Sequence, residues 1–132
     1  MMNTTMEPQP VIYIAGPFTA DTDDGIRENI AIANNWSMSA WKRGFAAVCP
    51  HMNTANGMGI CDEEVFLKGD ISIMLRCDAV LLVPGWQRSA GTRKEIDVAK
   101  SKAIPVFTTL GAIERHFGQF DTHTEDKDNK TA

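Results

Sequence analysis

The chain of 132 residues lacks the features that define several large classes of protein. No apolar run approaches the roughly 20 residues that a membrane-spanning helix requires. The first ten residues do not have the basic and then apolar layout of a secretory signal. With a formal net charge of −4, the chain offers no broad basic surface for nucleic acid. We therefore expect neither a membrane nor a nucleic-acid polymer among its partners.

Cysteine is scarce as well, and the three cysteines (Cys49, Cys61 and Cys77) form no C-x-x-C pair. This excludes a disulfide framework and a zinc pattern, and it favours free thiols in the reducing cytoplasm. The glycine motifs G-x-G-x-x-G and G-x-x-x-x-G-K-[ST] are both missing, which disfavours a dinucleotide or P-loop protein. No metal and no cofactor is expected.

What the chain does have is a regular alternation of apolar runs and helical periodicity. This order predicts an α/β protein, a small flavodoxin-like or Rossmann-like sandwich whose four- or five-stranded parallel sheet has helices on both faces. The domain is expected over 10–118, between a disordered lead-in (1–9) and a disordered charged tail (119–132). The strands are predicted at Val11 to Ala15, Phe45 to Cys49, Ala79 to Val83 and Ile104 to Thr108.

Helix starts are marked by polar residues that can cap them. Asp23 or Asp24 is predicted to cap the first helix and Asp62 a later one, whereas 50–53 is expected to open a loop. A last short helix is expected from Leu110 to Phe117.

The most informative segment follows the third predicted strand. That strand ends at Pro84-Gly85-Trp86, a small polar loop follows, and Glu95 then falls near the start of a helix. Parallel sheets bind ligands at the carboxyl ends of their strands. A helix N-terminus favours an ionised carboxylate, so we expect Glu95 to be a nucleophile or base. The alternative is a solvated helical glutamate paired with a nearby cation.

Two further carboxylates accompany this segment, Asp70 on the preceding helix and Asp78 at the start of the strand. Carboxylates placed close to a third push their pKa values apart and supply a proton donor beside an ionised partner. The alternatives are a surface position for Asp70 and a cap or turn for Asp78.

The turn after the first strand, Gly16-Pro17-Phe18, exposes backbone amides that can receive a phosphate or a sugar hydroxyl. It can equally be a plain strand-ending turn. Within the strand, Tyr13 needs a polar partner for its hydroxyl if it is buried.

Other polar or aromatic residues are expected near the same edge of the sheet. Ser89, Gly91 and Thr92 form an anion seat or a helix cap. The remaining candidates are His51 and Asn53 after the second strand, and Trp86, which either anchors its loop or stacks on a base.

The order of these motifs carries more weight than any one of them. Y-I-A-G-P, P-H-x-N, D-x-x-x-x-x-x-C-D and S-x-G-x-x-x-E follow each other along the chain. Together they resemble the nucleoside 2-deoxyribosyltransferase-like superfamily, over roughly 11–108. The chain is most similar to small, often phage-borne proteins of unknown function within it. The S-x-G-x-x-x-E spacing also resembles that of 2′-deoxynucleoside 5′-monophosphate N-glycosidases.

The resemblance implies a role for each matching residue. Glu95 would attack C1′ of the deoxyribose, Asp78 would assist the leaving base, and Asp70 would be a second acid. Tyr13 would orient the nucleophile, Gly16 and its loop would line the sugar, and Ser89 with Gly91 would hold the 5′ end.

The expected function is therefore cleavage or transfer of the N-glycosidic bond of 2′-deoxynucleosides or their 5′-monophosphates. The alternatives are a non-catalytic nucleotide-binding protein and a scaffold that keeps only the fold. A homodimer or larger homo-oligomer is expected, because a small sheet often covers a face by self-association. The predicted location is the cytoplasm, that of the host if the gene is phage-borne.

Overall fold

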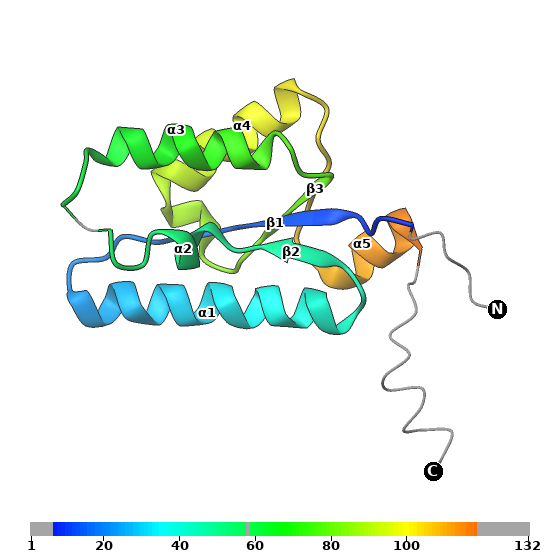
Figure 1. Cartoon of the computed structure of the whole chain (residues 1–132), viewed down its shortest axis with the longest axis horizontal. Helices are drawn as coiled ribbons and strands as arrows, with labels where there is room; N and C mark the ends of the chain where they lie inside the picture. Colours follow the sequence, from blue (N-terminus) through cyan, green and yellow to red (C-terminus); the bar gives the residue numbers. More distant parts are fainter. Residues whose placement is uncertain (1–6, 58, 119–132) are drawn as a thin grey trace, which may run out of the picture.

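A computed structural model describes residues 7–57 and 59–118. In this part of the chain, strands and helices alternate as the sequence predicts (Figure 1). The elements are β1 (Val11–Ala15), α1 (Asp23–Lys42), β2 (Ala46–Val48), α2 (Pro50–Asn53), α3 (Glu63–Met74), β3 (Ala79–Leu82), the 3-10 turn η1 (Trp86–Arg88), α4 (Ala90–Ser101), β4 (Val106–Phe107) and α5 (Leu110–Phe117).

The four strands form one parallel sheet in the order β2-β1-β3-β4. Strand β1 therefore has a partner on each side, with Tyr13 in register with Val48 of β2 and with Val80 of β3. The chain first leaves β1 toward β2 and later returns to the other side at β3. Ligands of open α/β sheets bind where the strand order reverses in this way, outside the carboxyl ends of the strands. The predicted α/β class is confirmed.

Helices cover both faces of the sheet, with α1 and α5 on one side and α3 and α4 on the other (Figure 1). Side chains of β1 alternate between the two layers, as the pleat of a strand requires. Ile12 and Ile14 pack with α1 and α5, whereas Tyr13 and Ala15 pack with α3 and α4. Tyr13 is therefore held on the face that carries the S-x-G-x-x-x-E segment.

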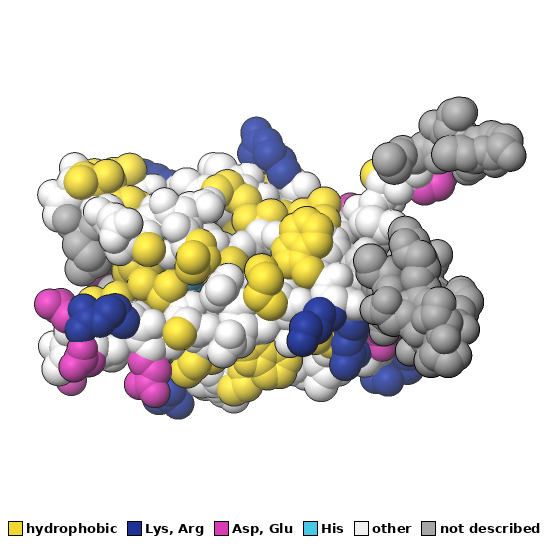
Figure 2. Space-filling view, turned by 60° about the horizontal axis from the view of Figure 1, so that its bottom comes forward, with side chains coloured by type: hydrophobic (Ala, Val, Ile, Leu, Met, Phe, Trp, Pro, Cys, Tyr) yellow, Lys and Arg dark blue, Asp and Glu magenta, His cyan; other side chains and the backbone are white. Residues whose placement is uncertain are grey.

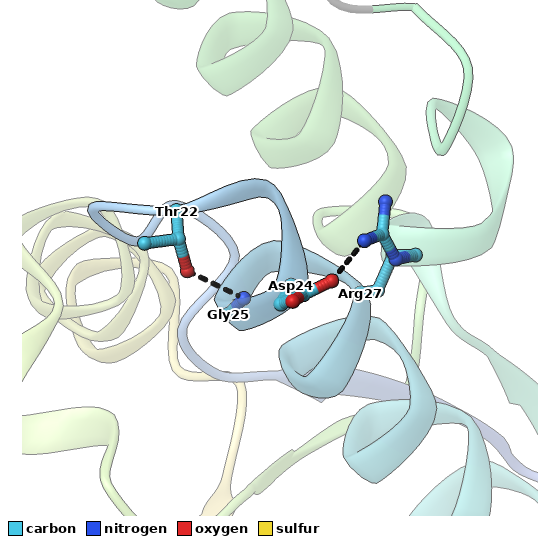
Figure 3. A network of polar contacts seen from close by, with 4 residues as sticks. All are labelled: Thr22, Asp24, Gly25 and Arg27. Carbon is cyan, nitrogen blue, oxygen red and sulfur yellow. Dashed lines mark hydrogen bonds and ion pairs between the residues drawn. The ribbon is translucent and has the colours of Figure 1, made fainter.

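The start of α1 differs in detail from the prediction. Thr22 caps the helix, and its Oγ1 accepts a hydrogen bond of 3.0 Å from the amide of Gly25 (Figure 3). Asp24, one of the two predicted caps, lies in the first turn and forms an ion pair with Arg27 (Figure 3). A threonine hydroxyl is an effective cap, and the acidic first turn still complements the positive end of the helix.

Two predicted loops are partly helical. Residues 50–53 form the single turn α2, which begins with Pro50, a residue whose fixed φ suits the first position of a helix. Ser89 caps α4, which begins at Ala90, so Gly91 and Thr92 belong to the first turn of that helix. The capping alternative for Ser89 is thus the one that the structure shows.

Several large apolar side chains are exposed on the face formed by α1, β2 and α2 (Figure 2). They include Met38 (46% exposed), Trp41 (51%) and Met52 (50%). No helix in the described ranges is both long and apolar enough to cross a membrane. The predicted tail (119–132) and residues 1–6 of the predicted lead-in lie outside the described residues.

Candidate active site

A pocket of about 1170 Å³ opens at the carboxyl edge of the sheet. Its walls come from the loop after β1, the α2 region, α3 and the start of α4. Its size suits a ligand as large as a nucleotide. The predicted site residues in its lining are Tyr13, Gly16, Pro17, Phe18, His51, Asp70, Ser89, Gly91, Thr92 and Glu95.

Two residues of the pocket lining, one from β1 and one from α4, are joined by a hydrogen bond. The hydroxyl of Tyr13 donates to Oε2 of Glu95 over 2.5 Å. Both residues are buried, Tyr13 completely and Glu95 with 6% of its surface exposed. Glu95 is therefore a pocket residue held by a specific donor, and the solvated alternative considered for it does not apply.

The charge state of Glu95 differs from the expected one. Burial raises the pKa of Glu95 to about 7, and the nearby negative charge of Asp70 raises it further, while the Tyr13 hydrogen bond opposes them. Glu95 lies in the second turn of α4, where the effect of the helix N-terminus has faded. Near pH 7 this carboxyl therefore exists in both its protonated and its ionised form.

Asp70 reaches the same pocket from α3, as the second acidic residue. Partial burial raises the pKa of Asp70 to about 6. Its charge also raises the pKa of Tyr13, after the larger effects of burial and of the charge on Glu95. Tyr13, Asp70 and Glu95 thus form one electrostatically coupled group, which we call the acid cluster.

Asp78 is not part of this group. It precedes β3, at the amino edge of the sheet, where its Oδ2 accepts a hydrogen bond of 2.7 Å from the backbone amide of Val11. Asp78 does not line the pocket. The expectation that it assists a leaving base beside Glu95 is corrected, because the strand separates its two ends by roughly 3.3 Å per residue. Asp78 instead fits the alternative given for it, a cap or turn residue, here at the start of a strand.

At the start of α4, the hydroxyl groups of Ser89 and Thr92 form hydrogen bonds within the helix terminus itself. Ser89 Oγ accepts hydrogen bonds from the backbone amide (3.1 Å) and the hydroxyl (2.9 Å) of Thr92. A serine hydroxyl has one hydrogen of its own, so Ser89 keeps a donor for a ligand. Thr92 is buried and fixes the orientation of Ser89.

His51 lies deep in the wall of the pocket, 5% exposed. Its Nε2 is 3.2 Å from the carbonyl oxygen of Gly16 and 2.9 Å from that of Pro17. Carbonyl oxygens only accept, so Nε2 carries the hydrogen. Burial lowers the pKa of His51, which keeps the ring neutral. Its Nδ1 is buried and has no partner in the described part of the chain.

Two predicted binding residues do not reach the pocket lining. Asn53 ends α2 and is exposed. Trp86 is half-buried in η1 and packs against the buried cluster beneath α3 and α4. Trp86 therefore anchors its loop, which was the alternative to stacking on a base.

Sequence reasoning missed two cations and one amide in the lining, namely Arg88, Lys94 and Asn29. Nothing in the described residues pairs with the side chain of Arg88 or Lys94 in a hydrogen bond or an ion pair. Gly85 has a φ of +94°, and a Cβ there would stand 2.7 Å from Nη2 of Arg88. In the sequence, Arg88 and Lys94 lie on either side of Ser89, which is itself a predicted site residue. That proximity was the signal that could have identified the two cations.

Charge is unevenly distributed around the pocket. Arg88 and Lys94 both come from the approach to α4 or its first turns, whereas the carboxylates come mostly from the other walls. The acidic lining residues are Asp21, Glu28, Glu63, Glu64, Asp70 and Glu95. Within 7–57 and 59–118, no three His, Cys, Asp or Glu residues are grouped to hold a metal ion.

The fold is similar to that of a known enzyme structure. A solved structure of a 2-deoxyribosyltransferase from the psychrotolerant bacterium Bacillus psychrosaccharolyticus matches with a TM-score of 0.53 at 19% sequence identity. The match covers 73% of this chain and 69% of the bacterial one. That enzyme is described as a biocatalyst for the synthesis of antiviral and antitumoral nucleosides. The likeness confirms the expected fold.

The chain belongs to a family defined by a domain of unknown function, DUF4406, whose model matches residues 10–108. This segment contains all the lining residues named above. No curated protein sequence matches significantly.

Proposed function

We propose that this protein acts on the N-glycosidic bond of 2′-deoxynucleosides or their 5′-monophosphates, with Glu95 as nucleophile. The observation that carries the proposal is the buried carboxyl of Glu95, held by Tyr13 in a nucleotide-sized pocket with a second acid, Asp70. A positioned carboxylate beside a carboxylic acid is the arrangement that glycoside cleavage requires. The fold likeness to a deoxyribosyltransferase supports it.

The proposed reaction has two steps. The ionised Glu95 attacks C1′, the bond from C1′ to the base nitrogen breaks, and its electron pair leaves with the base. Asp70, in its protonated form, gives a proton to the departing base. Water or a second base then attacks C1′ and releases Glu95, with the incoming nucleophile returning its proton to Asp70. Water makes the protein a hydrolase, and a second base makes it a transferase.

The pKa values of the two acids set how much of the pair is in the reactive form. Asp70 titrates near 6 and Glu95 near 7. Because the two groups are coupled, the pair holds a single proton between these values, and the higher pKa of Glu95 makes the reactive form, with the proton on Asp70, the minor one. The reactive form requires one proton on the pair, so activity is expected to be greatest between about pH 6 and pH 7.

The unpaired cations support an anionic substrate. Arg88 and Lys94 are exposed and lie on either side of Ser89 in the sequence, whereas Tyr13 and Glu95 of the acid cluster are buried. A guanidinium binds phosphate oxygens well. The 5′-monophosphates are therefore the preferred substrates within the proposal, with the phosphate at the start of α4.

The test is incubation of the purified protein with the four deoxynucleosides and their 5′-monophosphates, followed by chromatography for free base. Release by the wild type and its loss in Glu95→Ala would support the proposal. A parallel reaction with a second base distinguishes transfer from hydrolysis. Tight binding of an intact nucleotide without release of base would instead favour a binding protein, and equal release by Glu95→Ala would exclude Glu95 as nucleophile.

The predicted setting also belongs to this proposal. All three cysteines are free, which suits the reducing cytoplasm, that of the host if the gene is phage-borne. Homo-oligomers are proposed to form through the exposed apolar face of α1 and α2, at Met38, Trp41 and Met52. Light scattering of the wild type and of Trp41→Glu tests this, because a charge at a buried contact dissociates an interface.

A further inference from the structure

The loop that follows β1 is held by two side chains from two different helices. His51 of α2 donates to the carbonyl oxygens of Gly16 and Pro17 at 3.2 and 2.9 Å. Asn29 of α1 donates through Nδ2 to the carbonyl oxygens of Phe18 and Thr19 at 3.1 and 3.3 Å. Four consecutive carbonyl groups, 16–19, are thus occupied by only two donors.

The backbone N–H groups of the same loop differ from its carbonyl groups in their hydrogen bonding. Pro17 has no N–H. The N–H groups of Phe18, Thr19 and Ala20 donate to no acceptor within the described residues, although all three residues line the pocket. Because the two side chains fix the carbonyls, they also fix the peptide planes and hence the direction of these donors. Backbone donors aligned beside a pocket are suited to oxygen acceptors.

We propose that His51 and Asn29 are positioning residues, which together clamp this loop so that its amide groups bind oxygen acceptors on the sugar–phosphate part of the substrate. The proposal rests on the proposed function for the identity of that substrate. A neutral His51 is sufficient for the clamp, because it already carries the hydrogen on Nε2 that both carbonyls need.

The clamp is local and leaves the acid cluster intact. Neither His51 nor Asn29 contacts Tyr13 or Glu95 through a hydrogen bond within the described residues. Its loss should therefore weaken substrate binding and leave the chemical step nearly unchanged. A residue needed only for folding would instead lower the melting temperature and the amount of active protein, without raising KM.

The kinetic test uses variants that keep size and remove the donor. Asn29→Asp and His51→Leu are each expected to raise KM about tenfold, the effect of losing 1.4 kcal/mol of binding, with kcat changed less than threefold. His51→Gln retains an amide donor and should recover part of the loss. Asn35→Ala on α1 and Asn53→Ala on α2 are matched controls, because both residues are exposed and absent from the pocket lining. Unchanged KM in both clamp variants would overturn the proposal.

A binding test separates this proposal from the reaction itself. Backbone amide resonances are recorded while 2-deoxyribose 5-phosphate, or 2-deoxyribose alone, is added to the protein. Shifts at Phe18, Thr19 and Ala20 in the wild type, lost in Asn29→Asp, would support the clamp. A response to both probes assigns the amides to sugar oxygens, and a response to the phosphate probe alone assigns them to the phosphate.

The two tests fail separately. Shifts at these amides in a protein that releases no base would leave the clamp in place and reject the proposed function. Base release without any shift at residues 18–20, or with shifts that persist in Asn29→Asp, would reject the clamp and leave the function standing.

Discussion

Tyr13 and Glu95 are 82 positions apart in the chain, yet the phenol hydroxyl lies 2.5 Å from the carboxylate of Glu95 in a buried contact. The hydrogen bond opposes the effects that raise the pKa of Glu95. A donor that favours the ionised form of a carboxyl also orients it. In the proposed reaction, Tyr13 therefore orients the nucleophile, Glu95, and favours its ionised form.

Replacing Tyr13 with Phe keeps the ring and removes this hydrogen bond. The pKa of Glu95 should rise, so the alkaline limb of the pH profile, where the pair loses its last proton, moves to higher pH. A hydrogen bond to a charged group contributes about 1.5–3 kcal/mol, which predicts a loss of base release of about 10- to 100-fold near pH 7. Rates of base release between pH 5 and pH 9 test this. An unshifted alkaline limb would contradict it.

Asp70 and Asp78 provide a matched pair of substitutions. Asp70→Asn removes the proposed proton donor from the pocket, and base release should fall at least 100-fold, the usual contribution of a general acid. Asp78→Asn alters a residue outside the lining, which accepts the Val11 amide. It should leave the rate within about threefold, because no proton transfer depends on it, and lower the melting temperature slightly. The reverse ranking of rates would contradict the assignment.

Stability should fall as pH rises. The pKa of Glu95 is raised from 4.5 to about 7, so the folded protein holds this proton more tightly than the unfolded chain. The corresponding stability is present at low pH and is lost between about pH 4.5 and pH 7. Asp70 acts in the same direction between 3.8 and about 6.

Glu95→Gln removes the larger part of the pH dependence of folding stability. At pH 8 the variant should be more stable than the wild type, by on the order of 3 kcal/mol at most. At pH 5 the two should differ little. Urea denaturation at both pH values measures this, and a difference that does not grow with pH would argue against a buried, raised Glu95.

Gly16 and Gly69 should respond to alanine in opposite ways. A Cβ at Gly16 would stand 2.7 Å from Cβ of Val83, the residue after β3, whereas one at Gly69 in α3 meets nothing within 4 Å. Gly16→Ala is expected to lose about 1–3 kcal/mol of stability through overpacking. Gly69→Ala is expected to gain about 0.5–1 kcal/mol through helix propensity. Chemical denaturation of both variants provides the comparison.

Most of the fold follows from the sequence because apolar runs and helical periodicity are strong local signals. The helix 110–117 has the predicted ends. The predicted strand 104–108 is shorter, since only Val106–Phe107 is strand at the edge of the sheet. The single turn α2 was missed because four residues carry no periodicity, although Pro50 was a clue.

The candidate site was predicted in part. The resemblance implied that Tyr13, Asp70 and Glu95 act at one site, and the structure brings all three into one pocket. The prediction for Asp78 was wrong. Its position before a strand of the parallel sheet already indicated the amino edge of the sheet, whereas the pocket lies at the carboxyl edge. The raised pKa of Glu95 depends on burial, and the contacts of Asn29 depend on tertiary structure, so neither is readable from local patterns.

The final helix has a practical consequence for how the protein is produced. The segment shared with the DUF4406 family ends at residue 108, yet α5 buries Leu110 and Ile113 in the core and sets Phe117 edge-on to Phe45, 6.4 Å between ring centres. A recombinant polypeptide cut at the family boundary would expose the underside of the sheet to water and to other chains. Expression boundaries drawn beyond Phe117 avoid making an insoluble fragment.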